Sequence, residues 1–204
     1  MQLSKWLFAQ FYDVLNSVVE SKVLPYRRMT AGRCEGHVLE IGAGTGANLS
    51  VLQHTSSITA VEPDRHMRRK LLSTARKHNV VVNISSCKGE GLSFPDDHFD
   101  SVVTTLVLCM VEDVEAVISE AYRVLKPGGR FYFYEHVVSK APIGKGLQKL
   151  LNPFWRWATT GCHLHRDIKR HLHGSQFQTV NLREFSLSLG VVIRIPNIVG
   201  YAVK

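Results

Sequence analysis

The feature that most constrains the fold is a glycine-rich stretch, VLEIGAGTGANL, at residues 38–49. Its apolar start predicts a buried parallel strand, and its glycines predict a tight turn that lets a ligand approach the backbone. The turn is expected to open a helix, whose free N–H groups Thr45 and Asn48 can bond. An ordinary strand-to-helix turn is the alternative, but Glu40 adds a carboxylate that needs a partner, such as a ligand amine. The candidate cofactor-binding residues here are Glu40, Gly42, Ala43, Gly44, Thr45, Gly46 and Asn48.

A second apolar segment, residues 58–61, ends in another carboxylate, Glu62. Nucleotide-binding βαβ units place an acid about twenty residues after the glycines, where it accepts hydrogen bonds from ribose hydroxyls. The pattern therefore predicts a right-handed βαβ unit that binds an adenosine-containing cofactor at the carboxyl ends of its strands. Pro63, directly after the acid, belongs to the predicted site.

Dinucleotides and S-adenosylmethionine are the two kinds of cofactor that fit this pattern. The dinucleotide turn has the form G-x-G-x-x-G and lays pyrophosphate on a helix N-terminus. This turn is G-A-G-T-G preceded by Glu40, and it resembles motif I of the class I S-adenosylmethionine-dependent methyltransferases. The resemblance implies that Glu40 lies near the methionine end of the cofactor and that the glycines pass under its sugar. A carboxylate also suits an ammonium and a sulfonium better than it suits a pyrophosphate.

A second loop and a strand end complete the predicted cofactor site. Class I methyltransferases commonly have G-D-A-E-x-L-P-F after the third strand, with the Asp bonding the adenine amino group. Here Lys88 stands at the Asp position, so the resemblance implies adenine contacts from the backbone near Gly89 and from Glu90. The next apolar strand, within residues 99–109, should present its carboxyl end to the transferred methyl group. These two segments contribute the candidates Gly89, Glu90, Gly91, Thr105 and Leu106.

The remaining pattern predicts an α/β fold, a Rossmann-like doubly wound sheet of seven strands. We expect a helix over 65–78, a strand over 80–85, a helix over 111–125 and a strand over 130–137. The R-V-L-K-P-G-G sequence between the last two is one of the more specific landmarks of class I methyltransferases. Alternating runs over 178–203 predict a closing hairpin, so the sheet should be mostly parallel with an antiparallel last strand.

Three later segments narrow the resemblance to one family. Residues 105–109 (TLVLC), 122–129 (YRVLKPGG) and 131–137 (FYFYEHV) resemble the methyltransferase-like 7 family, the alkyl thiol methyltransferases, as does the closing GYAVK. The resemblance implies an enzyme that transfers a methyl group from S-adenosylmethionine to a small, lipophilic acceptor, with a thiol the first candidate. Two alternatives stay open here. One is transfer to another small molecule or a lipid, and the other is a non-catalytic module that binds S-adenosylmethionine to regulate a partner.

The acceptor side of the site is less defined by the sequence. A thiol acceptor must lose its proton, because the thiolate is the nucleophile, and His136 at the end of the fifth strand is the candidate base. Packing at the strand end is the alternative role for this histidine. Pro142, Gly144 and Gly146 predict a loop after the strand, followed by an apolar segment that in this fold commonly covers the acceptor. The candidate substrate-contacting residues are Tyr12, Cys109 and Trp155.

The segment C-H-L-H at residues 162–165 concentrates possible metal ligands. It lacks the separated ligand pairs of a structural zinc site, so we expect no metal ion there. Its surroundings resemble the G-C-N-L-T-R of the methyltransferase-like 7 family, from which His163 and His165 depart.

A net charge of +8 allows acidic partners such as nucleic acid or anionic lipids. The basic helix expected over 65–78 has no interleaved aromatic side chains, which single-stranded nucleic acid would need for stacking. The chain also lacks the D/N-P-P-Y sequence that often marks methyltransferases of bases. We therefore expect a small-molecule acceptor and no nucleic-acid substrate.

Apolar side chains recur at helical spacing over residues 3–24 and predict an amphipathic helix that Pro25 ends. It could pack on the domain, act as a lid, or lie in a membrane interface. The family begins with a longer apolar anchoring segment, from which this N-terminus departs. We expect an N-terminal helix or lid at 1–30 and a methyltransferase domain at 31–204. Four scattered cysteines, no signal peptide and no transmembrane run indicate a cytoplasmic protein. Peripheral membrane contact would run through the N-terminal helix, and the sequence gives no sign of an obligate partner.

Overall fold

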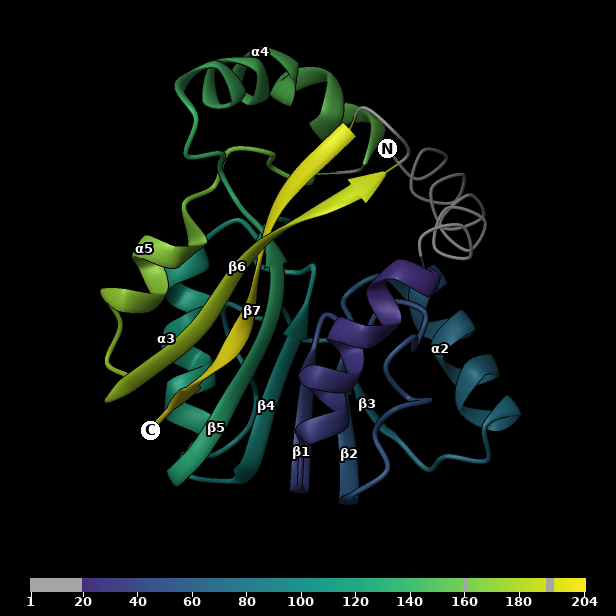
Figure 1. Ribbon diagram of the computed structural model, residues 1–204. Helices are drawn as coiled ribbons and strands as arrows, with labels where there is room; N and C mark the ends of the chain where they lie inside the picture. Colours follow the sequence, from purple (N-terminus) through teal and green to yellow (C-terminus); the bar gives the residue numbers. More distant parts are fainter. Residues whose placement is uncertain (1–19, 160, 190–192) are drawn as a thin grey trace.

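A seven-stranded sheet lies at the centre of the molecule, in the spatial order β3-β2-β1-β4-β5-β7-β6 (Figure 1). The computed structural model describes residues 20–159, 161–189 and 193–204. β7 runs antiparallel to both of its neighbours and the other neighbouring pairs are parallel, which confirms the predicted sheet. The strands are β1 (Gly36–Ile41), β2 (Thr55–Val61), β3 (Asn83–Ser85), β4 (Phe99–Thr105), β5 (Leu125–His136), β6 (Thr179–Leu189) and β7 (Ile193–Val203).

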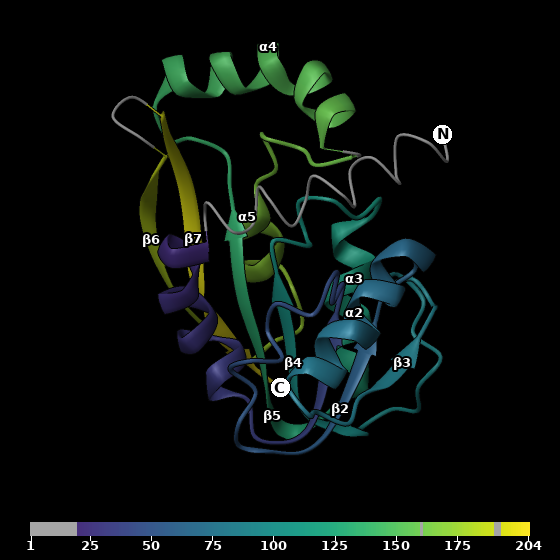
Figure 2. The same ribbon diagram turned by 90° about the vertical axis from the view of Figure 1, so that its right-hand side faces the viewer.

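Helices cover both faces of the sheet, because alternate residues of each buried strand point to opposite sides. On one face Val38 and Val103 pack with Leu71 of α2 and with the helix at residues 20–29. On the other face the strands pack against α3 and α5, and Figure 2 shows this layered arrangement from the side. Besides the helix at residues 20–29, the helical elements of the described chain are η1 (Ala31–Arg33), α2 (Arg65–Lys77), α3 (Val114–Val124), α4 (Pro142–Ala158) and α5 (Ile168–His173).

α2 begins directly after the second strand because Asp64 caps it. The Asp64 carboxylate accepts hydrogen bonds from the backbone N–H groups of His66 at 2.8 Å and Met67 at 3.1 Å. Met67, Leu71 and Ala75 then recur every fourth residue and are buried. The cap therefore fixes the start of α2 next to the predicted cofactor acid, Glu62.

The glycine-rich stretch does not open a regular helix, contrary to the prediction. Residues 44–51 form successive turns instead, with short-range bonds such as Gly46 N–H to Ala43 O at 2.9 Å and Val51 N–H to Asn48 O at 2.9 Å. Gly44 and Gly46 both have positive φ, at 56° and 85°, which a right-handed helix cannot contain. The positive φ angles of these glycines therefore give turns where the sequence predicts the start of a helix, and the turns bring the loop backbone close to the predicted cofactor site.

Two proline positions also depart from the sequence-based expectation. The helix at 20–29 continues through Pro25, because the next residue, Tyr26, stacks on both Phe185 and Tyr134, with ring centroids 4.1 and 5.2 Å away. Pro142, predicted in a loop, stands in the first turn of α4, where a helix tolerates proline.

The inner side of α4 explains why this segment is helical despite two glycines. Gln148 accepts a hydrogen bond from the Ser139 backbone N–H at 2.7 Å, and Asn152 accepts one from the Leu164 N–H at 2.9 Å. Trp155 packs against the main hydrophobic cluster. These three residues, spaced by four and three positions, hold α4 beyond the carboxyl ends of β4 and β5 (Figure 1).

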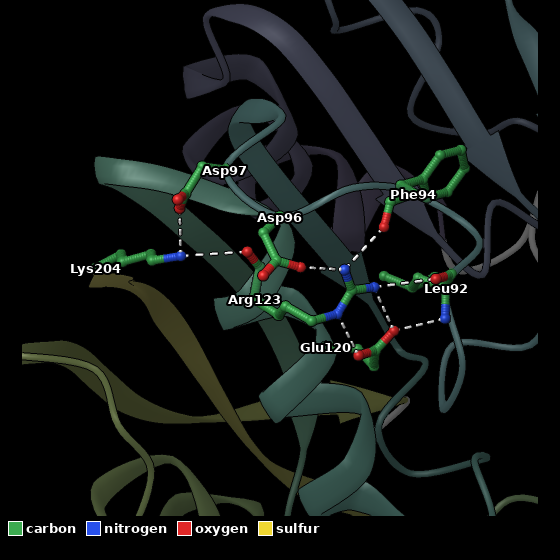
Figure 3. A network of polar contacts seen from close by, with 7 residues as sticks. All are labelled: Leu92, Phe94, Asp96, Asp97, Glu120, Arg123 and Lys204. Atoms are coloured by element: carbon green, nitrogen blue, oxygen red, sulfur yellow. Dashed lines mark hydrogen bonds and ion pairs between the residues drawn. The ribbon is translucent and has the colours of Figure 1, made fainter.

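A single guanidinium, that of Arg123 in α3, organises the loop that follows β3 (Figure 3). It donates to the Glu120 carboxylate at 2.7 and 2.8 Å, to Asp96 at 2.7 Å, and to the carbonyls of Phe94 at 2.8 Å and Leu92 at 3.0 Å. The hydrogen bond from Arg123 holds the pKa of Glu120 below its usual range. The network fixes the chain directly after residues 88–91, where the sequence predicts adenine contacts.

We expect Arg123→Met to lower the free energy of unfolding by about 1–3 kcal/mol, because it leaves two carbonyls without their side-chain donor and the Glu120 carboxylate with only the Leu92 N–H. Urea denaturation followed by circular dichroism measures this change. Arg123→Lys should recover only part of the loss, since an ammonium lacks the planar fork.

The control is Lys126→Met, which removes the ion pair between Lys126 and Asp100. The charged atoms of this pair are 2.6 Å apart, and the two side chains are 44% and 41% exposed. Its expected cost is below about 1 kcal/mol. Equal losses in the Arg123 and Lys126 variants would show that the loop does not depend on the guanidinium.

Candidate functional site

A cavity of about 330 Å³ opens at the carboxyl ends of β1, β2 and β4. Ligands of open α/β sheets bind at this edge, and the parallel strands bring the predicted loops together there. Of the predicted cofactor residues, those that line the cavity are Gly42, Gly44, Glu62, Pro63, Gly89, Glu90, Thr105 and Leu106.

The three glycines of the first loop have different physical roles. A Cβ at Gly42 would come within 2.6 Å of Val107, and one at Gly46 within 2.8 Å of Leu71, so packing requires glycine at both positions. A Cβ at Gly44 would have no atom within 4 Å, although Gly44 lines the cavity. The space beside Gly44 is therefore available to a ligand rather than filled by the protein.

The Glu62 carboxylate is held in a fixed orientation at the end of β2. Its Oε2 accepts the Gly44 backbone N–H and its Oε1 accepts that of Asp64, both at 2.8 Å. Burial raises the pKa of Glu62, and these two hydrogen bonds oppose the rise. Because each carboxylate oxygen has a further lone pair, Glu62 can still accept hydrogen bonds from ligand hydroxyls.

Glu40 lies behind the cavity wall in a buried polar group. Asn48 Nδ2 donates to Glu40 Oε1 at 2.7 Å and to Thr105 Oγ1 at 3.1 Å, while Asn48 Oδ1 accepts from Arg27 at 2.9 Å. Asn48 thus connects β1 to β4 and does not cap a helix, contrary to the prediction. Burial raises the pKa of Glu40 to about 7, and its Oε2 has no hydrogen-bond partner among the described residues.

The other cofactor candidates stand outside the cavity wall. The Thr45 carbonyl accepts from the Thr74 hydroxyl at 2.7 Å, so Thr45 connects the loop to α2 and, like Asn48, is no helix cap. The full set outside the wall is Glu40, Ala43, Thr45, Gly46, Asn48 and Gly91.

The loop at 88–91 meets the segment after β4 across the cavity. Lys88, which replaces the expected Asp, forms an ion pair with Glu112 at 3.3 Å, and Glu90 accepts the Glu112 backbone N–H at 2.9 Å. Sequence reasoning missed Asp64, Met67, Met110 and Glu112, which also line the cavity. Asp64 could have been found as a helix cap, whereas Met110 and Glu112 carry no motif.

Leu106 occupies a left-handed backbone conformation with φ of 58° at the end of β4, where its side chain lines the cavity. A branched residue in this region costs on the order of 1–3 kcal/mol and persists where the surroundings impose it. Here the Leu106 N–H is held by the Tyr134 carbonyl at 2.8 Å. Glu135 holds the next turn, because its Oε1 accepts the Val107 and Leu108 N–H groups at 2.9 and 3.1 Å.

Two acceptor-side candidates, His136 and Cys109, come together with a third residue, Cys162. His136 Nε2 lies 2.8 Å from Cys162 Sγ, which in turn is 3.6 Å from Cys109 Sγ. These side chains do not line the cavity, and Trp155 packs against the cluster that contains both cysteines. Tyr12 lies outside the described residues.

Charge is shared unequally within this group. Hydrogen bonds from Cys109 and from His136 lower the pKa of Cys162, whereas the pKa of Cys109 is raised by the same bond to Cys162. Burial lowers the pKa of His136, but the bond to Cys162 and its negative charge outweigh burial, so the net direction is upward. The directions of these shifts therefore make Cys162 easier to deprotonate than an ordinary cysteine and His136 easier to protonate than an ordinary histidine.

No helix among the described residues is both long and apolar enough to cross a membrane. The prediction of a membrane-interfacial helix over residues 3–24 falls mostly on residues outside the description.

Comparisons with known proteins agree with this geometry. A family described as "Methyltransferase domain" matches residues 39–133. Thiol S-methyltransferase TMT1A of Homo sapiens is 33% identical over 171 residues, which cover 82% of this chain and 70% of the relative. Thiol S-methyltransferase TMT1B of Rattus norvegicus is 34% identical over 172 residues, with coverage of 82% and 70%.

The solved structure of an S-adenosylmethionine-dependent methyltransferase from Thermotoga maritima shares the fold. It aligns over 100% of both chains with a TM-score of 0.73, at 23% identity. Together the fold, the cavity and the two thiol methyltransferases fulfil the expectation raised by the glycine loop. The chain is an S-adenosylmethionine-dependent methyltransferase and belongs to the methyltransferase-like 7 family.

Proposed function

We propose that this enzyme methylates the sulfur of a small, lipophilic thiol. The observation that carries the proposal is the cavity in which Gly44 leaves open space beside the fixed Glu62 carboxylate, at the methyl-transfer edge of the sheet. The named activity of the two mammalian relatives supports a thiol acceptor. Transfer to a lipid is the second candidate, because a phosphatidylethanolamine N-methyltransferase of Cereibacter sphaeroides is 30% identical over 150 residues.

The residues present fit S-adenosylmethionine. We assign the ribose hydroxyls to Glu62 and the adenine to the loop at 88–91, while the buried Glu40 carboxylate behind the cavity wall supplies negative charge that favours the cationic methionine end. When bound, the cofactor supplies a sulfonium methyl group, whose carbon bonds to the acceptor sulfur while the electron pair of the broken bond stays on the cofactor's sulfur. The chain contributes proximity, orientation and exclusion of water.

His136 is our candidate for activating the acceptor thiol. It stands at the carboxyl end of β5, and its Nε2 already faces a sulfur, that of Cys162, at 2.8 Å. Cys109 and Trp155 adjoin it, so the acceptor side is proposed to lie where the segment after β4 meets α4.

Transfer of a labelled methyl group to a panel of small thiols, amines, lipids and RNA tests the proposal. We expect labelling of lipophilic thiols, and loss of both labelling and cofactor binding in Gly44→Ala, because its Cβ fills the open space. Isothermal titration with S-adenosylmethionine measures the binding, for which we expect at least about a tenfold loss, or about 1.4 kcal/mol.

Gly128→Ala is the matched control. Gly128 also has positive φ, at 77°, with no atom within 4 Å of an added Cβ, but it does not line the cavity. Both alanines should cost roughly 1–2 kcal/mol of stability from backbone strain, while only the first abolishes binding. Tight cofactor binding with no acceptor labelled would favour the regulatory binding module instead.

The affinity for S-adenosylmethionine should rise with pH through neutrality. The pKa of Glu40 is raised to about 7 by burial, so part of the free protein holds a neutral carboxyl that must ionise before its charge can attract a cationic ligand in the cavity. Titrations between about pH 6 and about pH 8 are compared with those of Glu40→Gln, because the cofactor's own amine titrates nearby. The variant should bind more weakly and show a shallower dependence, and identical slopes would remove Glu40 from the binding site.

We also propose peripheral contact with an anionic membrane, for which α4 offers a surface within the described residues. Ile143, Leu150 and Trp157 on this helix are 88%, 77% and 78% exposed. α4 contains lysines and an arginine but no acidic residue, which complements anionic headgroups. Such contact would bring the acceptor side close to lipophilic substrates.

Ile143→Glu, Leu150→Glu and Trp157→Glu combined should reduce co-sedimentation with phosphatidylcholine–phosphatidylserine vesicles several-fold, because each change places a carboxylate in the apolar face. Val81→Glu is the control, since Val81 is 89% exposed but lies next to β3. Unchanged vesicle binding together with lower stability of the triple variant would mean that α4 packs within the chain.

A further inference from the structure

The cluster of Cys109, His136 and Cys162 combines three side chains with strong metal affinity in the protein interior. Cys109 follows β4, His136 ends β5, and Cys162 lies between α4 and α5. Their exposures are 1%, 8% and 7%, and their Sγ and Nε2 atoms all lie within 4.8 Å of one another. Three separate elements therefore converge on one point through their ligand atoms.

Sequence reasoning overlooked this group because its members are far apart in the chain. His136 and Cys162 are separated by 26 residues, and Cys109 and Cys162 by 53. The adjacent histidines in the C-H-L-H segment are not part of it, since the group contains only Cys162 from that segment. The sequence analysis expects no metal ion at the C-H-L-H segment because that segment is no self-contained zinc motif, and that expectation does not consider ligands from β5 and from the segment after β4.

The distances suit a tetrahedral ion. Two sulfurs bound to one Zn²⁺ at about 2.3 Å each lie roughly 3.8 Å apart, and the two Sγ atoms here are 3.6 Å apart. A sulfur and an imidazole nitrogen on the same ion lie roughly 3.5 Å apart, whereas Nε2 and Cys162 Sγ are at 2.8 Å. Binding an ion would therefore separate these two groups by less than 1 Å and would set Cys109 Sγ and Nε2, which lie within 4.8 Å of each other, roughly 3.5 Å apart. Both changes are on the order of side-chain rotations.

A positive charge also lies beside the cluster. The Arg166 guanidinium donates to the Leu108 carbonyl at 2.8 Å, and its positive charge interacts with both cysteines. Thiolate is the form of cysteine that binds metals, and two thiolates with one neutral imidazole neutralise a divalent ion.

We propose that Cys109, His136 and Cys162 bind a Zn²⁺ ion whose fourth position receives the sulfur of the acceptor. Three protein ligands with an open position are the pattern of catalytic zinc, whereas structural sites supply four. The described residues contribute three ligands to this group. The cluster adjoins the cavity through the segment after β4. Leu106, Val107 and Met110, which flank Cys109 in the chain, line the cavity.

A zinc ion in this position would account for how the acceptor thiol loses its S–H proton before methylation. A thiol that displaces the water ligand binds as thiolate and releases its S–H proton to solvent, so no side chain needs to act as base. His136 then activates the acceptor as a ligand of the ion. This catalytic consequence rests on the proposed function, whereas metal binding itself does not.

The experiment compares metal content and spectroscopy of the full chain, purified without oxygen and with a reductant, after growth with zinc. Mass spectrometry of the metals should find about one zinc per chain in the wild type and in Cys34→Ser, a buried cysteine outside the cluster. Cys162→Ser and His136→Gln should each lose at least tenfold in zinc affinity, measured by competition with a chromophoric chelator. Replacing Zn²⁺ by Co²⁺ should give thiolate-to-metal absorption that disappears in Cys109→Ser.

The outcomes separate the two proposals. Reduced protein that binds S-adenosylmethionine but takes up neither Zn²⁺ nor Co²⁺ would overturn the site, and so would a Cys109–Cys162 disulfide in zinc-replete protein. Cofactor titration confirms that each cysteine variant is folded. Full thiol methylation after complete removal of zinc would overturn the catalytic role, while zinc uptake by a protein that methylates no thiol would leave the site and reject the proposed function.

Discussion

The hydrogen bond between the Gly44 N–H and the Glu62 carboxylate joins the ends of β1 and β2, and the rest of the site depends on it. One Glu62 carboxylate oxygen accepts the Gly44 N–H at 2.8 Å and so fixes the glycine loop against the end of β2. The other oxygen accepts the Asp64 N–H, and Asp64 in turn caps the start of α2. A buried carboxylate without such donors would be costly. The same residue therefore organises the loop, the helix and the predicted ribose contact, so changes to any of these three should affect the others.

The second constraint is the polar group of Glu40, Asn48 and Arg27 below the cavity. Asn48 contacts both β1 and β4 and also the helix at residues 20–29 through Arg27. Since this helix also packs against β5 and β6 through Tyr26, the start of the described chain is connected to the cofactor site. Glu40 Oε2 has no hydrogen-bond partner among the described residues. A charge that binds nearby would therefore interact with this carboxylate and, through Asn48, with several elements.

Eight of the predicted cofactor residues line one cavity, for a physical reason. The determinants of the cofactor half of the site are local: a strand, a glycine turn and an acid lie within a few tens of residues, and parallel strands align their carboxyl ends. The same local reasoning failed where tertiary packing decides. Pro25 and Pro142 suggested breaks, but Tyr26 in one helix and Gln148 in the other make contacts that outweigh local propensity. Positive φ at Gly44 and Gly46 turned the expected helix into turns, and periodicity carries no information about φ.

The acceptor half of the site could not be predicted from local sequence patterns. The sequence offered His136 as a candidate base at a strand end and Cys109 as a candidate substrate contact, but nothing in the chain indicated that both approach Cys162. That encounter requires α4 to stand beyond the sheet and return the chain to β5, which Asn152 secures through the Leu164 N–H. A base and a metal ligand make opposite demands on the imidazole, because a base must be free to accept a proton, whereas a ligand gives its lone pair to the ion. A ring whose Nε2 already meets a sulfur in the interior satisfies the second demand better, and so the geometry shifts the chemistry of this site from proton transfer toward thiolate coordination.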